Sequence, residues 1–196
     1  MAAMSRHLVL VVVTVLLIGQ APVAHAQVQR WGVSLAVPLG LRFTDDPQTP
    51  TPPAADFPTG LRLALLTPMY VGVGIASYRT GFDTNAFPAA GRAVRVRLAE
   101  VQGMLPVPDG WVALGYGLGD AVFEPVSATS GVLTQEYLPS DAQEWFALAA
   151  FGIGDAWEVQ LGFHLLQVDL RYRTNGAEAT GRLDAQLLTG GAGYRF

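Results

Sequence analysis

The sequence predicts an all-β protein, an eight-stranded antiparallel up-and-down barrel that crosses a membrane. Apolar residues recur at every second position in eight segments, which is the periodicity of strands. The connections between these segments alternate between long and short, as they do in membrane barrels. Charged residues make up 14% of the chain and apolar residues 51%. That is too few charges for a water-soluble domain of this size, and it indicates an exterior that faces lipid.

The first 26 residues have the pattern of a secretory signal peptide. A short basic region precedes an apolar run, Leu8 to Gly19, and the small-x-small sequence Ala24-His25-Ala26 follows. The run is shorter than the roughly 20 apolar residues that span a bilayer, so it does not predict an anchor. We therefore expect export, cleavage after Ala26, and one barrel domain over residues 27–196.

The composition excludes several classes of protein. The chain has no Cys, so it forms no disulfides and no thiolate metal sites. Its formal net charge is −4, and nothing in it indicates nucleic-acid binding. Later segments never reach 18 consecutive apolar residues, and only helices and closed barrels satisfy the backbone in lipid. No cofactor motif is present, because Gly152-x-Gly154 lies in a strand or tight turn and not before a helix.

Period-2 alternation and turn residues define the expected strands and connections. The strands are expected at about 30–43, 59–67, 70–80, 91–104, 111–123, 143–153, 157–172 and 182–196. The long connections are 44–58, 81–90, 124–142 and 173–181, and the short ones are 67–69, 105–110 and 154–156. Short turns face the periplasm and long loops face outward, so both termini are expected in the periplasm.

Two segments have an irregular apolar phase. In 157–172 the apolar residues change face between Leu165 and Leu166, which predicts a β-bulge there. In 143–153 apolar residues occupy both faces, so the sequence leaves the orientation open.

Aromatic residues near the strand ends predict two belts at the membrane–water interfaces. The expected periplasmic belt is Trp31, Tyr70, Trp111, Trp157, Tyr194 and Phe196, and the expected outer belt is Phe43, Tyr78, Phe82, Phe123, Trp145 and Tyr172.

Polar residues on the face opposite the lipid are the candidates for a lumen or ligand site. They are Arg42, Arg62, Arg95, Arg97, Glu158, His164, Asp169 and Arg171, with Glu144, Gln160, Asp184 and Gln186 as further members. An eight-stranded barrel is just wide enough for its own side chains, and charges of both signs in it should pair. Glycines at 72, 74, 115, 117 and 119 are expected to leave room for Arg95 and Arg97. The set predicts a salt-bridged core, with a selective pore or binding pocket as the alternative.

The closing segment Thr189–Phe196 carries Gly191, Tyr194 and a C-terminal Phe196, and it resembles the insertion signal of bacterial outer-membrane barrels. With this signal and the strand pattern, residues 27–196 resemble the small eight-stranded barrels of the OmpA-like and opacity-protein type, which share a porin-like wall. The resemblance implies the outer membrane of a Gram-negative cell. It also implies a monomer that interacts with the barrel-assembly machinery during insertion. After insertion, its partners are expected to be outer-membrane lipid and lipopolysaccharide.

Three functions compete on the sequence: a structural or surface-interaction barrel, a small-solute channel or binding barrel, and a lipid-modifying enzyme. Two small outer-membrane enzyme families, a lipid A deacylase and a palmitoyltransferase, use His with Ser and an acid. His164 is followed by Leu165-Leu166-Gln167, without the Ser that the deacylase pattern requires. We therefore expect no enzyme. Acidic residues near the loops, such as Asp45, Asp83 and Asp141, are expected to be solvated and not to bind metal.

Overall fold

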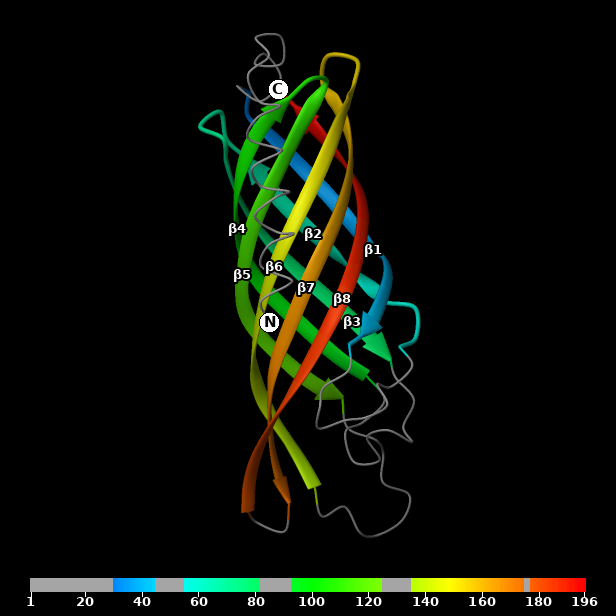
Figure 1. The fold of residues 1–196 in the computed structure, drawn as a ribbon, viewed down its shortest axis with the longest axis vertical. Coiled ribbons are helices and arrows are strands. Elements are labelled where there is room, and N and C mark those ends of the chain that lie inside the picture. Colours follow the sequence, from blue (N-terminus) through cyan, green and yellow to red (C-terminus); the bar gives the residue numbers. More distant parts are fainter. Residues whose placement is uncertain (1–29, 45–54, 82–92, 125–134, 175–176) are drawn as a thin grey trace, which may run out of the picture.

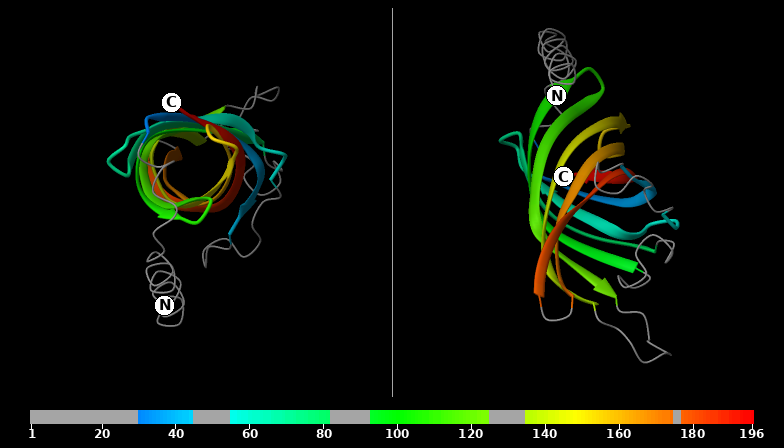
Figure 2. Two further views of the ribbon diagram at one scale, coloured as in Figure 1. Left: turned by 90° about the horizontal axis from the view of Figure 1, so that it is seen from above. Right: turned by 60° about the horizontal axis from the view of Figure 1, so that its bottom comes forward.

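The computed structural model describes residues 30–44, 55–81, 93–124, 135–174 and 177–196. They form one closed antiparallel barrel in which each strand pairs with its neighbours in sequence and the last strand pairs with the first (Figures 1 and 2). The strands are β1 (Gly32–Phe43), β2 (Thr59–Leu66), β3 (Val71–Gly81), β4 (Ala93–Val107), β5 (Gly110–Glu124), β6 (Gln135–Ile153), β7 (Trp157–Thr174) and β8 (Ala177–Arg195). The predicted fold class is confirmed.

One end of the barrel carries the short turns and the C-terminus, and we call it the turn end; the opposite end is the loop end (Figure 1). Among the described residues, no helix is long and apolar enough to cross a membrane. The predicted signal peptide, Asp45, Asp83 and Phe82 lie outside the described residues, as does the side chain of Tyr172.

Three neighbouring strands are longer than predicted. β6 begins at Gln135 and β8 at Ala177, so both extend into segments that were expected to be loops. The polar start of β6 is paired in register with the end of β7, from Gln135 with Thr174 to Leu138 with Arg171. These strands therefore reach past the others at the loop end (Figure 1).

The register corrects the prediction for β7. β7 pairs with β8 without any shift from Trp157 to Thr174, so the predicted bulge at Leu165–Leu166 is wrong. Leu165 faces outward and is 43% exposed, whereas Leu166 faces inward and is 6% exposed. The shifts that the structure does contain lie at Pro38/Gly40 in β1 and Leu138/Asp141 in β6. β6 itself alternates regularly, with Trp145 outside and Phe146 inside.

The polarity of the barrel reverses along its axis while the strands keep their alternation. On β4 the outward residues are apolar from Leu105 to Ala99 and then become Arg97 and Arg95. The inward residues of β4 change in the opposite sense, from Gln102 and Glu100 to Leu98, Val96 and Val94. β7 does the same: outside, Leu165 gives way to Gln167 and Asp169, and inside, His164 gives way to Leu166 and Val168. Near the turn end the exterior suits lipid, and near the loop end it suits water.

This reversal overturns part of the lumen prediction. Five candidates are exposed on the outer face of the wall, not inside it: Arg42, Arg95, Arg97, Asp169 and Arg171. The prediction took apolar to mean outward along the whole strand, but above the lipid the apolar side chains are the ones that turn inward.

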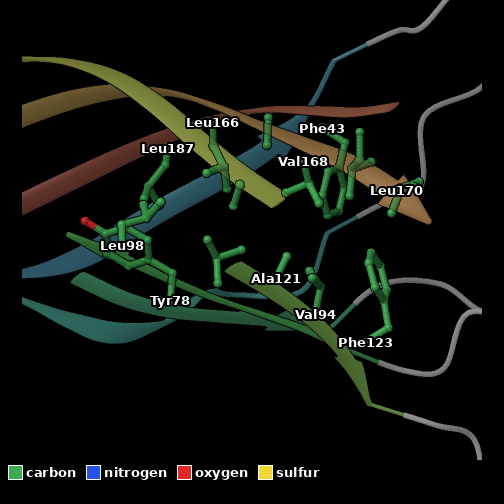
Figure 3. Packing of buried hydrophobic residues seen from close by; sticks show 14 of the residues in the cluster. Phe43, Tyr78, Val94, Leu98, Ala121, Phe123, Leu166, Val168, Leu170 and Leu187 are labelled. Atoms are coloured by element: carbon green, nitrogen blue, oxygen red, sulfur yellow. The ribbon is translucent and has the colours of Figure 1, made fainter. Parts of the chain in front are cut away.

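Apolar side chains fill the lumen at the loop end. Phe43, Val168 and Leu170 face Val94, Ala121 and Phe123 across the barrel (Figure 3). We call this cluster the apolar layer; its members also include Tyr78, Val96, Leu98, Leu166, Leu183, Ala185 and Leu187. A cavity beside Phe43, Val94 and Val168 in this layer has a volume of only about 10 Å³. Close packing of this kind excludes water from the upper lumen.

The aromatic belts are only partly as predicted. Trp31, Trp157, Tyr194 and Phe196 are exposed at the turn end, and the Trp157 and Tyr194 ring centroids are 5.0 Å apart. The predicted outer belt is wrong for three residues, because Phe43, Tyr78 and Phe123 are buried in the apolar layer. Trp111 is likewise buried inside the turn end, and Tyr70 is half-buried. Trp145 is exposed as predicted, beside Tyr116 on the outer wall.

Candidate functional site

The candidate site is the polar interior of the lipid-facing half of the barrel. It consists of two groups of buried side chains below the apolar layer. The central layer comprises Arg62, Glu100, Gln102, Glu144, His164 and Thr189, and the turn-end layer comprises Trp111, Glu158, Gln160 and Arg195. Alternation along five strands, β2, β4, β6, β7 and β8, directs the central layer inward.

Arg62 holds one side of the central layer. Its Nε donates a hydrogen bond to Glu100 Oε2 at 2.6 Å, and its Nη2 donates to Gln102 Oε1 at 2.6 Å. Its guanidinium carbon also lies 4.9 Å from the centroid of the Phe146 ring. The Arg62 guanidinium therefore has three partners: a carboxylate, an amide oxygen and an aromatic ring. These contacts fix the orientation of all three neighbouring side chains.

His164 holds the other side. Its Nε2 lies 2.9 Å from Thr189 Oγ1, and its Nδ1 lies 3.4 Å from Glu144 Oε2. The Phe146 ring stacks on the imidazole with centroids 5.3 Å apart. Phe146 thus lies against both Arg62 and His164 and joins the two sides of the layer.

Two glycines of β5 make room for this layer. A Cβ at Gly117 would lie 3.2 Å from Glu144 Cγ and 3.3 Å from Glu100 Cγ, so both carboxylate side chains pass over this residue. A Cβ at Gly115 would collide with the Phe146 ring. The predicted role of these glycines, to accommodate Arg95 and Arg97, is therefore wrong; they accommodate the central layer.

The charges of the central layer do not balance by themselves. It holds one guanidinium and two carboxylates, so it is neutral only with one added proton. Several of its polar atoms also have no protein hydrogen-bond partner: Arg62 Nη1, Glu100 Oε1, Gln102 Nε2, both Glu144 oxygens and His164 Nδ1. Buried atoms of this kind bind water when space allows.

The turn-end layer closes the barrel on the side of the C-terminus. Glu158 Oε2 accepts hydrogen bonds from Trp111 Nε1 at 2.8 Å and from Arg195 Nε at 3.3 Å. Glu158 Oε1 accepts from Gln160 Nε2 at 2.7 Å. The Arg195 side chain also donates to the backbone oxygen of Arg30 at 3.2 Å, which connects the closing strand to the start of the described chain.

Of the predicted set, the structure places Arg62, Glu158 and His164 inside the barrel, together with the further members Glu144 and Gln160. The other two further members, Asp184 and Gln186, lie on the outer wall. Arg62 and His164 belong to the central layer, and Glu158 lies in the other layer. Sequence reasoning missed Glu100, Gln102, Thr189 and Arg195. Glu100 and Gln102 alternate correctly with Val101, but the phase assigned to residues 91–104 from Val94, Val96 and Leu98 placed them on the wrong face.

The insertion-signal residues occupy three different environments. Tyr194 and Phe196 face outward, and their ring centroids are 6.4 Å apart. Gly191 lies against the β1 backbone at Leu35 and Ala36, where no Cβ fits.

Within the part of the chain that the structure describes, no group of three or more His, Asp or Glu side chains has the arrangement of a metal site.

Comparison with solved structures shows what this barrel is similar to. Outer membrane protein AlkL, solved by solid-state NMR in DMPC lipid bilayers, matches with a TM-score of 0.54 and 12% identity over 86% of this chain and 90% of that chain. Outer membrane protein OprG from Pseudomonas aeruginosa is also found, with a TM-score of 0.41 and 12% identity over 85% of this chain and 93% of that chain. The likeness to AlkL shows the fold, that of the small eight-stranded β-barrels of outer membranes.

No protein-family model matches the sequence. No curated protein matches it either.

Proposed function

We propose that the protein is a monomeric structural barrel of the bacterial outer membrane, with a sealed lumen and an interaction surface at its loop end. The apolar exterior of the turn-end half, with Trp157, Tyr194 and Phe196 at its edge, supports placement in a membrane. Those outward aromatics in the closing strand also support recognition by the barrel-assembly machinery.

The apolar layer is the observation that carries the proposal of a sealed lumen. Its cavity of about 10 Å³ holds at most one water molecule. A continuous aqueous path for solutes would need the side chains of at least three strands to move, because Phe43, Phe123 and Leu170 all project into it. Close packing makes such a collective displacement costly.

The central layer supports the same proposal from below. Arg62, Glu100 and Gln102 are joined by hydrogen bonds of 2.6 Å, and they lie across the lumen from His164 and Thr189. Such a bonded layer obstructs the lumen independently of the apolar layer above it.

The second candidate is a barrel that binds or passes a small polar solute. The observation that favours it is the set of unpartnered polar atoms in the central layer, above all the two oxygens of Glu144. These atoms offer hydrogen-bond capacity to water or a small ligand. The apolar layer argues against passage, because a polar solute would have to cross it.

The proposal includes no catalysis. His164 and Thr189 are within the distance of a base and a hydroxyl nucleophile, and Glu144 lies behind the imidazole. The hydroxyl belongs to a Thr in mid-lumen, however, and not to a Ser at the outer rim. All three side chains are buried beneath the apolar layer, so a lipid substrate has no route to them.

Single-channel conductance of the refolded mature protein in a planar bilayer tests the proposal. Folding is first verified by a heat-dependent shift in gel mobility. We expect no steady openings from the wild type. Steady openings that change in Arg62→Ala, whose side chain lies in the lumen, but not in Arg97→Ala, whose side chain lies on the outer wall, would establish the channel instead.

A further inference from the structure

The outer wall of β3 and β4 carries three arginines that face away from the barrel. Arg79 is directly paired with Arg95 in the strand register, and Arg97 is paired with Ser77. Arg95 and Arg97 point to the same side of β4, about 7 Å apart along the strand. We call Arg79, Arg95 and Arg97 the arginine sector.

The arginine sector begins where the apolar exterior ends. From Leu105 to Arg97, β4 advances eight residues, roughly 20 Å along the axis at a tilt of about 40°. The apolar band of outer-membrane barrels is about 25 Å tall, so Arg97 lies near its upper edge, and Arg95, two residues further along β4, reaches the level of the lipid headgroups.

A shallow groove of about 470 Å³ extends across the outer wall of β2, β3, β4 and β5, and Arg97 of the sector lines it. Arg97, Ser77 and Asp120 form its polar head, and its lower part is apolar. Leu63, Ile75 and Leu118 line that part around the small side chain of Ala99, and Leu61 lies beside Ser77 in the row of Arg97. A polar head above an apolar trough matches an amphiphile whose charged headgroup sits directly above its acyl chains.

The register row of Arg97 continues around the wall mainly through acidic residues. Continuing the register row of Arg97 around the wall gives Asp120, Asp141 and Asp169 on β5, β6 and β7, before Arg182 on β8. Arg42, Arg171 and Arg182 are exposed elsewhere on the outer wall, so the β3–β4 side differs in that its three arginines are neighbours in the strand register. Guanidinium groups bind phosphate in bidentate geometry and stay charged at every physiological pH.

We propose that the arginine sector and this groove bind the phosphorylated glycolipid of the outer leaflet, the lipid A part of lipopolysaccharide. The arginines bind a phosphate of the headgroup, and one acyl chain lies along Ile75, Ala99 and Leu118. This deepens the interaction-surface part of the proposed function by naming its partner. The lumen takes no part in the binding.

Retention of lipid by the folded full-length mature protein in detergent tests the inference, with native mass spectrometry as the readout. The probes are bisphosphorylated lipid A, the same lipid with both phosphates removed, and inorganic phosphate as a competitor. The variants are Arg97→Gln alone and Arg79→Gln/Arg95→Gln/Arg97→Gln. The matched control is Arg182→Gln, an exposed outer-wall arginine on β8 that pairs with Asp184 at 2.8 Å.

We expect the wild type and the control to retain bisphosphorylated lipid A. The triple variant should bind it at least ten-fold more weakly, and the single variant should fall in between. Equal retention of the dephosphorylated lipid would overturn the inference, because acyl chains alone would then explain binding. Release by millimolar inorganic phosphate would overturn it in favour of a free-anion site, and so would unchanged binding by the folded triple variant.

The single variant covers the case in which the triple variant does not fold. The conductance assay is independent of all these outcomes, so failure of the lipid inference and failure of the sealed-lumen proposal can be told apart.

Discussion

Arg195 and Glu158 join the closing strand to β7 at the turn end, with Arg195 Nε 3.3 Å from Glu158 Oε2. Their side chains are 2% and 4% exposed. Arg195 lies between Tyr194 and Phe196 in the sequence. The Arg195 side chain points into the lumen, and the rings of its two neighbours face outward, toward lipid. The inward residue closes the barrel, and the outward pair contributes to the apolar exterior.

Breaking this pair should destabilise the barrel. Arg195→Ala leaves the buried Glu158 carboxylate without its counter-ion, which costs about 3–5 kcal/mol for a buried pair. Urea unfolding in lipid vesicles, followed by tryptophan fluorescence, measures the change. The control is Arg182→Ala, which removes the exposed pair with Asp184 and should cost less than about 1 kcal/mol. Equal losses in the two variants would contradict a structural role for the buried pair.

The central layer should depend on Arg62 more than on either of its acids. Arg62→Met removes the only guanidinium and leaves Glu100 and Glu144 side by side over Gly117, so we expect a loss of about 3–5 kcal/mol in the free energy of unfolding. Adding Glu100→Gln removes one of the two charges. The double variant should therefore be more stable than Arg62→Met by at least about 1 kcal/mol. If the stability losses of the single variants Arg62→Met and Glu100→Gln simply added in the double variant, that result would count against direct pairing of Arg62 with Glu100.

The space that Gly115 provides should also be measurable. Gly115→Ala places a methyl group against the Phe146 ring and pushes it out of its position between Arg62 and His164, at a cost of about 1–3 kcal/mol. Gly103 on β4 is the matched control, because a Cβ there meets nothing within 4 Å. Gly103→Ala should leave stability unchanged or raise it slightly. A Gly115→Ala barrel as stable as the wild type would show that Phe146 is not held tightly.

The sequence predicts the barrel well and its interior less well, and β4 explains the difference. Strand number and strand order follow from period-2 alternation and loop lengths, which depend only on local pattern. The direction of each side chain depends also on what surrounds the strand, and that changes from lipid to water along β4 and β7. The prediction placed all four of Arg62, Glu158, Arg95 and Asp169 inside. It is right for Arg62 and Glu158, which lie in the lipid-facing half, and wrong for Arg95 and Asp169, which lie above it.

A change of apolar phase within one strand therefore has two possible causes, a bulge or a change of solvent. In β7 the sequence change at Leu165–Leu166 was interpreted as a bulge, but the register is continuous there. The polar outward residues Gln167 and Asp169 that follow distinguish the two cases. After a bulge, the outward residues of the strand would again be apolar, because the strand would still face lipid. After a change of solvent, the outward residues are polar, as Gln167 and Asp169 are.

The closing signal should affect assembly more than stability. Phe196 is exposed, and its described hydrogen bond is from its backbone nitrogen to the Trp31 oxygen, at 2.8 Å. Phe196→Ala keeps that bond, so the refolded variant should unfold in urea close to the wild type. In cells it should reach the outer membrane at a reduced level, measured by fractionation and the heat-dependent gel shift. Normal assembly in cells would contradict the assignment of Phe196 to the signal.

The reversal of polarity on β4 can be tested directly, because the chain contains no Cys and a single introduced thiol is unique. Arg97→Cys places the thiol on the outer wall near the upper edge of the apolar band, and Val96→Cys places it in the apolar layer. A membrane-impermeant maleimide added to intact cells should label the first variant at least ten-fold faster than the second. The two positions are adjacent, so they share the same depth and the same strand.

Heat-unfolded samples provide the control, in which both thiols should react at similar rates. Faster labelling at residue 96 than at residue 97 in folded protein would reverse the assignment. It would return Arg97 to the lumen, as part of the salt-bridged core that the sequence predicts. Labelling of neither thiol in intact cells, with normal reaction after unfolding, would place Arg97 below the outer surface. It would then contradict the headgroup level derived from the length of β4.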